Sequence, residues 1–350
     1  MKDLIIKKDN TIIEALKKIG KSAEKNLIVT DDQNKLLGIL SDGDLRRAIL
    51  KKKKLTDKID KVYNKKSFYF YENELNIENV KKKFIEKKIF FVPVVDNKKI
   101  IKDILTWDKV FSKKNSEKIY KRNIPVVIMA GGKGTRLEPF TKVLPKPLIP
   151  IDDKPVIEHI IDSFTKYGSK NFFISLNYKS KILKSFFEEL NPPYSIKYLE
   201  ENIPLGTAGA LYFLKDKMKS DFYVTNSDII LKIDHSDLYD FHKKNKNDIT
   251  IVVVAKEFEI PYGTCEINSK GELNTIKEKP KFNFLINSGL YLFNHKILNH
   301  LKKDKKLDMN ELIQSLIKKG KKIKIFPVTE KMWIDVGQWV EYKKIVDKLN

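Results

Sequence analysis

The sequence predicts an α/β protein with two domains, and three observations support this prediction. The chain has 350 residues, which is about twice what one hydrophobic core usually supports. Residues 1–115 contain a unit of roughly 60 residues that occurs twice. From Pro125 onward, apolar strands alternate with amphipathic helices, which is typical of a layered sheet with helices on its faces. We therefore expect a small α+β domain made of two similar halves, followed by a larger α/β domain.

The small domain is predicted from its repeat. In the first copy, a helix at 11–20 precedes residues 26–44, in which we expect a strand, a turn, a second strand and the start of a helix. In the second copy, a helix at 75–88 precedes the same succession at 89–110. Two copies are too few for a solenoid, but they can pack on each other as one pseudo-symmetric domain.

A polar segment separates the two domains. Residues 112–123 contain almost no apolar side chains and are predicted to be a linker, which gives domain boundaries of 1–115, 116–123 and 124–350. In the larger domain, strands are expected at 125–130, 171–176, 195–200, 222–225, 250–256, within the apolar run 284–293, and at 324–327. Helices are expected at 156–167, 179–190, 206–216, 310–319 and 338–349.

The chain carries a formal charge of +23, from 69 basic and 46 acidic residues. Only four of the basic residues are arginines, so lysine supplies the other 65. Nucleic-acid-binding surfaces more often include arginine, whose planar fork binds phosphates and guanine edges. We therefore interpret most of the charge as a compositional background and do not expect nucleic acid as a partner. The four arginines are Arg46, Arg47, Arg122 and Arg136.

Cysteine content and apolar runs indicate the compartment. Cys265 is the single cysteine, so no intrachain disulfide can form, which favours the reducing cytosol. Residues 1–9 lack the apolar region of a signal peptide. The longest apolar stretch, 124–130, is far shorter than the roughly 20 residues that span a bilayer. We expect a cytoplasmic protein with no membrane partner.

The sharpest local pattern directly follows the predicted strand at 125–130. Gly131, Gly132 and Gly134 fall within four residues, which lets backbone N–H groups approach a ligand closely, as phosphate-binding loops require. The spacing is neither that of the P-loop nor that of the dinucleotide-binding fingerprint. Arg136 ends the loop, and prolines on both sides fix Lys146 in place. Together these residues predict a site for a polyphosphate.

Residues 130–148 resemble the signature of the sugar-1-phosphate nucleotidyltransferases, GGxGTRLxPxTxxxPKPLxP, and the resemblance spans residues 124 to about 340. It implies a Rossmann-like domain with a mixed central sheet and flanking helices. It also implies a reaction in which an oxygen of a sugar-1-phosphate attacks the α-phosphorus of a nucleoside triphosphate and expels pyrophosphate.

The other motifs of that family appear in order along the chain. The resemblance implies that the nucleotide is bound by Ala130, Gly131, Gly132, Gly134, Thr135, Gly206 and Thr207. It implies that the sugar phosphate is bound by Gly263, Glu278, Lys279, Asn287 and Gly289. Arg136, Lys146 and Asp228 are implied to be catalytic, and Asp228 and Asp335 are implied to bind the metal.

Elementary chemistry agrees with these residue types. Both substrates are negatively charged, so a metal and fixed cations must offset their repulsion. Asp228 and Asp335, 107 residues apart, are hard oxygen ligands suited to Mg²⁺. Arg136 is expected to stabilise the departing pyrophosphate, Lys146 to lie beside the reacting phosphates, and Lys279 to hold the sugar phosphate. No side chain need act as nucleophile or general base, because a phosphate monoester is already anionic.

Some residue types that often serve catalysis are expected to be structural here. His159, His235 and His295 show no metal-ligand spacing, so they are expected to be ordinary helix or cap residues. Trp333 and Trp339 are expected to pack against neighbours rather than stack on a base.

The repeated unit at 1–115 resembles a pair of CBS motifs, a regulatory module that usually binds adenine nucleotides between its halves. The resemblance implies that Ser41 and Asp44 contact a ribose, with Arg46 and Arg47 nearby. The second copy departs from the pattern around Asp108, so the first copy carries the expected site. The alternative is that the pair acts only as a dimerisation platform or a spacer. CBS pairs often stack as dimers, so we expect a homodimer.

A CBS pair in front of this catalytic domain resembles the glucosamine-1-phosphate guanylyltransferases of bacterial legionaminic acid synthesis. That resemblance implies GTP and glucosamine-1-phosphate as substrates and GDP-glucosamine as product. The alternatives are a mannose- or heptose-1-phosphate guanylyltransferase and a glucose-1-phosphate thymidylyl- or uridylyltransferase. An alternative of another class is a non-catalytic nucleotide-sugar sensor, for which we would expect a damaged signature. A nucleic-acid binder would instead show salt-sensitive retention on DNA.

Overall fold

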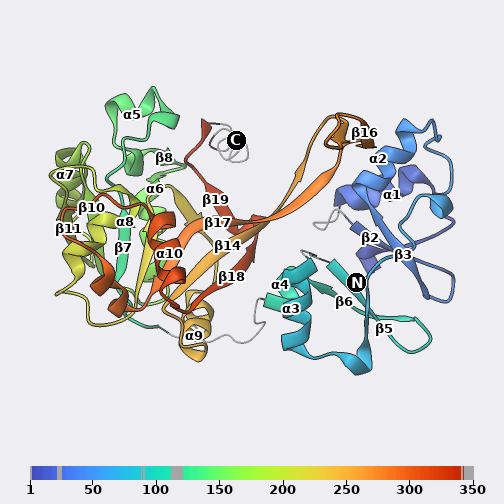
Figure 1. Cartoon of the computed structure of the whole chain (residues 1–350), viewed down its shortest axis with the longest axis horizontal. Helices are drawn as coiled ribbons and strands as arrows, with labels where there is room; N and C mark the ends of the chain where they lie inside the picture. The colour runs from blue at the N-terminus through green and yellow to red at the C-terminus, as the bar shows by residue number, and fades with distance from the viewer. Residues whose placement is uncertain are drawn as a thin grey trace. The chain divides into compact units, whose positions relative to one another are not determined.

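The computed structural model describes residues 2–21, 26–87, 89, 91–111, 121–339 and 342. The chain divides into two units, Met1–Lys114 and Asn115–Asn350, each described by itself below. The predicted linker at 116–123 and the predicted helix at 338–349 lie for the most part outside the described residues. The prediction of an α/β fold with a mixed sheet is confirmed, as the strand pairing below shows (Figure 1).

The first unit consists of two halves with the same order of elements. The first half contains β1 (Ile5–Lys7), α1 (Ile12–Lys21), β2 (Asn26–Thr30), β3 (Leu36–Ser41) and α2 (Asp42–Leu50). The second half contains β4 (Phe70–Tyr71), α3 (Ile77–Lys87), β5 (Phe91–Val95), β6 (Ile101–Thr106) and α4 (Trp107–Phe111). In each half, the first strand pairs parallel with the second, and the second pairs antiparallel with the third.

The two halves pack through their sheets. A shared apolar cluster contains Ile28 and Leu36 from the first half and Phe91, Val95 and Ile104 from the second. The turns also exchange main-chain hydrogen bonds, because the Leu36 N–H donates to the Lys99 carbonyl at 2.8 Å. This packing produces the pseudo-symmetric domain that the repeat predicts.

Gly38 makes the first half different from the second. The N–H of its neighbour Ile39 donates to the Asn64 carbonyl at 3.1 Å, and the Asn64 N–H donates back to the Ile39 carbonyl at 2.9 Å. A Cβ atom at position 38 would collide with that Asn64 carbonyl oxygen. The crossing of residues 63–64 over β3 therefore requires glycine at this position.

The second unit is built on a seven-stranded sheet in the order β11-β10-β7-β12-β17-β14-β18. Its strands are β7 (Val126–Met129), β10 (Asn171–Leu176), β11 (Ser195–Glu200), β12 (Phe222–Asn226), β14 (Ile249–Glu259), β17 (Lys281–Phe293) and β18 (Ile323–Thr329). The first four strands in this order run parallel to one another. β17 is antiparallel to both of its neighbours, and β14 and β18 are parallel.

Apolar cores cover both faces of this sheet. On one face lie α6 (Val156–Thr165), α7 (Ser180–Leu190) and α9 (His235–Lys244), whose buried side chains include Ile160, Leu183 and Leu238. On the other face lie η6 (Ala210–Leu214) and α10 (Met309–Lys318), with Leu214 and Leu316 fully buried. The predicted helix at 206–216 is instead a single turn, α8 (Gly206–Gly209), continued by the 3₁₀ helix η6. Glycine at both ends of α8 is the physical reason for the short α-helix.

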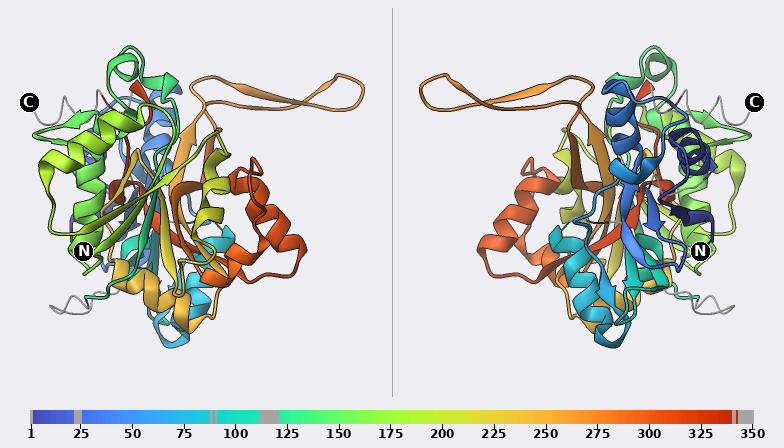
Figure 2. Two further views of the ribbon diagram at one scale, coloured as in Figure 1. Left: turned by 90° about the vertical axis from the view of Figure 1, so that its left-hand side faces the viewer. Right: turned by 90° about the vertical axis from the view of Figure 1, so that its right-hand side faces the viewer.

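Several short elements complete the second unit, and the sequence did not predict them. They are α5 (Phe140–Val143), β8 (Pro150–Ile151) with β9 (Lys154–Pro155), and β13 (Ile229–Leu231) with β19 (Trp333–Asp335). A hairpin of β15 (Thr264–Ile267) and β16 (Leu273–Lys277) extends the β14–β17 pair. Figure 2 shows this hairpin in orange as an arm that stands away from the sheet. Among the described residues, no helix has the length and apolarity needed to cross a membrane.

Candidate active site

The parallel strands β7, β10, β11 and β12 bring four distant segments to one edge of the sheet. Their carboxyl ends are followed by Gly131, Asn177, Glu201 and Asp228. Ligands of open α/β sheets bind at this edge, in the crevice outside the strand ends. The topology therefore places the Gly-rich loop and the predicted metal aspartate in the same region.

The Gly-rich loop is tightly held at its two ends. A Cβ atom at Gly131 would lie 2.8 Å from Glu201 Oε1, and one at Gly134 would lie 2.9 Å from the Lys146 side chain. Gly134 also has a φ of 70°, a left-handed conformation that favours glycine. A Cβ atom at Gly132 would meet nothing within 4 Å. The loop is thus fixed at Gly131 and Gly134 and open in between, where its backbone could meet a phosphate.

The predicted nucleotide-binding residues Gly206 and Thr207 are anchored to a helix. Gly206 has a φ of 79°, and a Cβ atom there would lie 2.7 Å from Asp308 Oδ1. The Thr207 N–H donates to the same oxygen at 3.1 Å, while Thr207 Oγ1 accepts from the Met309 N–H at 2.8 Å. Asp308 is the N-cap of α10. The start of α10 therefore sets the position of Gly206 and Thr207.

Asp228 and Asp335 meet because two short strands pair. β13 begins directly after Asp228 and runs antiparallel to β19, with Ile229 opposite Asp335. The Val336 N–H donates to the Asp228 carbonyl at 2.9 Å. A Cβ atom at Gly337 would collide with Asp228 Oδ2 and lie 2.9 Å from Asp335 Oδ1. Only glycine at position 337 therefore allows both carboxylates to occupy this spot.

Burial, a hydrogen bond and the neighbouring charges all act on the pKa of Asp335. Burial raises the pKa of Asp335, the Gly337 N–H lowers it through a 2.7 Å hydrogen bond, and the charge of Asp228 raises it further. Lys146 and Arg136 act more weakly to lower the same pKa. Lys146 forms an ion pair with Asp228, and only 12% and 10% of these side chains are exposed. The site is therefore a desolvated carboxylate pair that a further cation would stabilise.

The donor set fits Mg²⁺, although only two of its members are acidic side chains. Among the described residues there is no group of three or more His, Cys, Asp and Glu side chains that could hold a metal. Mg²⁺ is usually bound by one or two carboxylates together with substrate phosphates and water. Asp228 and Asp335 would supply the carboxylates, and the remaining ligands would come from the substrates.

A cavity of about 450 Å³ opens beside the carboxylate pair. Of the residues predicted from sequence, it is lined by Arg136, Asp228, Asn287, Gly289 and Asp335. Asn287 is held in place, because its Nδ2 donates to the Tyr291 hydroxyl at 2.6 Å. The cavity thus connects the predicted metal ligands to part of the predicted sugar site.

The cavity wall also contains residues that the sequence did not predict to be functional. Lys256 lines it, with its ammonium 3.0 Å from Glu330 Oε1 and 5.5 Å from the ring centre of Trp333. Trp333 packs against the apolar core, as expected, but it also lines the cavity, and its buried indole N–H has no hydrogen-bond partner among the described residues. Trp339 also packs, on Phe140. A single lysine among 65 carries no local signal, so Lys256 could be found only from the structure.

The remaining predicted sugar-site residues lie at the base of the arm. A Cβ atom at Gly263 would lie 3.1 Å from Glu278 Oε2, so these two residues are neighbours. The Lys279 N–H donates to the Tyr262 carbonyl at 3.2 Å. Gly263, Glu278 and Lys279 are not among the residues that line the cavity. The structure therefore groups them with one another and separately from Asn287 and Gly289.

Ser41 and Asp44 in the first unit form a helix cap. Ser41 is the N-cap of α2: its Oγ accepts from the Asp44 N–H at 3.1 Å, and Asp44 Oδ2 accepts from the Ser41 N–H at 2.9 Å. Asp44 Oδ1 also pairs with Arg47 at 2.6 Å. This reciprocal arrangement is a capping box, and it gives both residues a structural role.

Comparison with known proteins agrees with this geometry. The nucleotidyl transferase family model matches residues 125–350, and the CBS domain model matches residues 1–51, the first of the two halves. A D-glycero-alpha-D-manno-heptose 1-phosphate guanylyltransferase of Campylobacter jejuni is 34% identical over 218 residues, which cover 62% of this chain and 96% of that protein. A mannose-1-phosphate guanyltransferase of Schizosaccharomyces pombe is 33% identical over 226 residues; the match covers 62% of this chain and only 61% of the relative.

Solved structures share the fold of the second unit. The crystal structure of HddC from Yersinia pseudotuberculosis complexed with GMP-PN is 29% identical, covers 65% of this chain and 100% of that one, and has a TM-score of 0.52. A putative glucose-1-phosphate thymidylyltransferase from Bacillus anthracis, 22% identical with a TM-score of 0.51, covers 64% of this chain and 94% of that one. The family match begins just before β7 and continues through the whole second unit. The chain therefore belongs to the nucleotidyl transferase family and has a CBS domain at its N-terminus.

Proposed function

We propose that the protein is a sugar-1-phosphate guanylyltransferase, which transfers GMP from GTP to glucosamine-1-phosphate and releases pyrophosphate. The product would be GDP-glucosamine, for bacterial legionaminic acid or surface glycan synthesis. The observation that carries the proposal is the meeting of Asp228 and Asp335 around Gly337, beside Arg136 and Lys146. These groups are the charges needed to bring two phosphorylated substrates together.

The proposed reaction is a single displacement at phosphorus. An oxygen of the sugar phosphate forms a bond to the α-phosphorus of GTP, and the bond to the bridging oxygen of the β-phosphate breaks. The electron pair leaves with pyrophosphate, so no side chain is modified and no proton must be removed. When bound, Mg²⁺ would neutralise phosphate charge and align the two reacting groups.

Four cationic side chains have separate roles in this proposal. Arg136 lines the cavity and would stabilise the triphosphate as pyrophosphate leaves. Lys146 would exchange its pairing with Asp228 for a phosphate oxygen, leaving that carboxylate to the metal. Among the described residues, Lys256 pairs only with the half-exposed Glu330 and with aromatic rings, so its ammonium can turn to an anionic ligand at low cost. Lys279 would reach the sugar phosphate from the arm.

A buried carboxylate supports guanine as the base. Glu201 lies beside Gly131, and burial raises its pKa, while hydrogen bonds from the Leu205 N–H and Ser175 lower it. Guanine presents two adjacent donors, N1–H and N2–H, that one carboxylate can accept. Uracil and thymine present a single ring N–H between two carbonyls. The names of the relatives, which are guanylyltransferases, support the same choice of base.

A second candidate substrate is mannose-1-phosphate or a heptose-1-phosphate. It is favoured by the relatives themselves, whose names specify mannose and D-glycero-D-manno-heptose. Glucosamine-1-phosphate is favoured by the combination of a CBS pair with this catalytic domain. Sugars of this kind differ by one hydroxyl or amino group, so one or two contacts decide between them.

For the first unit, we propose a nucleotide site and a dimer. The site would lie at Ser41 and Asp44, where an adenine nucleotide would have to share these groups with the capping box. The protein would act as a homodimer in the cytoplasm, in keeping with its single cysteine.

The test is pyrophosphate release by the full chain with Mg²⁺. GTP, ATP, UTP and dTTP are each offered with glucosamine-, mannose-, heptose- and glucose-1-phosphate. GTP with glucosamine-1-phosphate should give the highest kcat/KM. GTP turning over no faster than UTP or dTTP would overturn the guanylyl assignment, and a faster reaction with mannose or heptose would replace the sugar. Binding of nucleotide sugar without any turnover would favour the sensor.

A further inference from the structure

The arm formed by β15 and β16 has one apolar face that is exposed. Cys265 lies opposite Ile276, and Ile267 lies opposite Leu273, so the four side chains share one side of the two-stranded ribbon. Ile267, Leu273 and Ile276 are 66%, 60% and 67% exposed, and Cys265 is exposed too. Side chains this apolar and this exposed, gathered on one face, mark an interaction surface rather than scattered surface residues.

The opposite face of the arm is polar and internally satisfied. Lys277 Nζ lies 2.6 Å from Glu266 Oε1, and the Thr275 hydroxyl donates to Glu266 Oε2 at 3.2 Å. Thr264 lies opposite Lys277 on the same side. Polar and apolar side chains alternate along β15, and the register shift beside Ile267 keeps Leu273 on the same side as Ile276, although two polar residues lie between them. This pattern is that of a strand pair with one solvated face and one covered face. The sequence of the arm is therefore built for a partner on the Cys265 side.

Nothing in the described part of the second unit covers the apolar face. β15 and β16 form a sheet of their own with two strands, and Figure 2 shows them standing free of the seven-stranded sheet. A lone two-stranded hairpin is at best marginally stable in water and needs a further strand or a packed face. A covering partner would supply that packing.

The charge of the arm indicates which partner can approach. Residues 256–284 contain five lysines and five glutamates, so this segment is neutral in a chain of charge +23. Two copies of the chain repel one another over most of their surface, but not where two arms meet. An isologous contact also places the same apolar set on both sides, so each face finds a surface of matching chemistry.

We propose that the apolar face of the arm, made of Cys265, Ile267, Leu273 and Ile276, binds the same face of a second copy of the chain. The inference specifies the interface of the proposed homodimer and does not depend on which substrates the enzyme uses. Four side chains per copy form a contact smaller than the roughly 800 Å² per partner of a standard interface. The arm contact alone therefore gives a reversible, concentration-dependent dimer.

The single cysteine allows a direct test on the unaltered full chain. A short bismaleimide should link Cys265 of one copy to Cys265 of the other and give a covalent dimer on a denaturing gel, in an amount that rises with protein concentration. Cys265→Ser should give none. The double variant Ile267→Glu, Ile276→Glu should weaken dimerisation in sedimentation equilibrium at least about tenfold, because it buries four like charges in the contact.

A matched control uses the polar face of the same arm. Thr264→Glu adds the same charge on this face, opposite Lys277, and should leave both the dissociation constant and the cross-link unchanged. Circular dichroism of each variant verifies that the chain is folded. A dimer that neither cross-links at Cys265 nor responds to the double variant would overturn the arm interface while leaving the homodimer standing. A monomer at every concentration would overturn both, whereas the pyrophosphate assay judges the proposed activity separately.

Discussion

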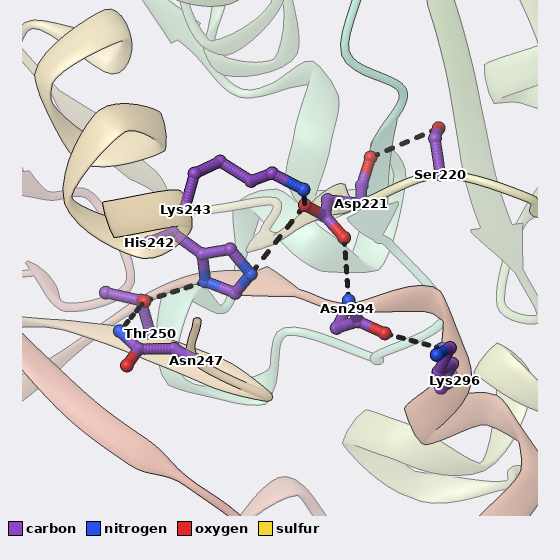
Figure 3. Close-up of polar contacts among 8 residues, drawn as sticks. All are labelled: Ser220, Asp221, His242, Lys243, Asn247, Thr250, Asn294 and Lys296. Atoms are coloured by element: carbon purple, nitrogen blue, oxygen red, sulfur yellow. Dashed lines mark hydrogen bonds and ion pairs between the residues drawn. The ribbon is translucent and has the colours of Figure 1, made fainter. Parts of the chain in front are cut away.

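The strand β12 has a buried carboxylate at each end, and the two are used differently. Asp221 precedes the strand, and its oxygens meet Lys243 Nζ at 3.0 Å and Asn294 Nδ2 at 3.1 Å (Figure 3). Asp228 follows the strand seven positions later, pairs with Lys146 alone among the described cations and faces the cavity. Both side chains are similarly buried, so burial alone does not distinguish them.

The comparison shows that the partners of a buried carboxylate indicate its role. At Asp221, protein donors occupy both oxygens, and Figure 3 shows His242, Thr250 and Asn247 continuing the network. At Asp228, a second carboxylate is placed close by, which raises the free energy of the empty site. The first arrangement stabilises the fold, whereas the second, which has Lys146 as its one cationic partner among the described residues, would be stabilised further by the proposed metal and phosphates.

The largest expected effect is on catalysis. Asp228→Asn removes a charge that the proposed metal needs, so kcat in the pyrophosphate assay should fall roughly a thousandfold. The unfolding temperature should change little, because the substitution removes both the ion pair with Lys146 and the repulsion from Asp335, and these two losses act in opposite directions. The exposed Asp153→Asn is the matched control and should keep full activity. Undiminished turnover by Asp228→Asn would remove the assignment of this residue.

The opposite end of the strand should show the reverse pattern. Asp221→Ala leaves Asn294 without its acceptor, whereas the half-exposed Lys243 can turn to water, so the free energy of unfolding should fall by about 2–3 kcal/mol. Urea unfolding measures that loss. At a temperature where the variant is folded, its kcat should remain within about twofold of the parent. A collapse of kcat as large as that of Asp228→Asn would show that the two ends are not separate in function.

The smallest effect depends on pH and concerns the helix that covers the start of β12. Burial lowers the pKa of His235 to about 3, against an ordinary value of 6.5. Between these two pH values the unfolded chain binds a proton at His235 and the folded chain does not. The free energy of unfolding therefore decreases as pH falls from 6.5 toward 3. The His235 ring lies against the rings of Phe164 and Tyr223. His235→Phe removes the titratable imidazole and with it this pH-dependent loss of stability. The difference in unfolding free energy between pH 6.5 and 5 should shrink by about 2 kcal/mol; an unchanged difference would contradict the burial of a neutral ring.

Much of the fold follows from local pattern, because long periodic segments are fixed by their own burial. β10 and β11 occupy the predicted residues, and α6 and α7 differ only at their ends. The Gly-rich loop could also be recognised locally. Contacts between short segments that are far apart in the sequence could not be predicted. The three-residue pairing of β13 with β19, which joins Asp228 to Asp335, is too short to leave a periodic signal.

The cavity wall was the least predictable part of the site. Lys256 is one lysine in a lysine-rich chain, and Trp333 looks like a core residue until the lining of the cavity is known. The apolar face of the arm is hidden for a related reason. Its residues alternate with polar ones on β15 but lie three positions apart on β16, so their common side becomes visible only when the register pairs Cys265 with Ile276 and Ile267 with Leu273.

Gly38 makes the two halves of the first unit non-equivalent. The two halves have the same strand pairing, yet Asp103 stands in the second half where Gly38 stands in the first. Copying the second half over the first would drive an aspartate into the Asn64 carbonyl, whereas copying the first over the second adds no side chain there. A symmetrised version of this domain can therefore be engineered from one template only. The two halves are therefore not interchangeable, although they have the same topology.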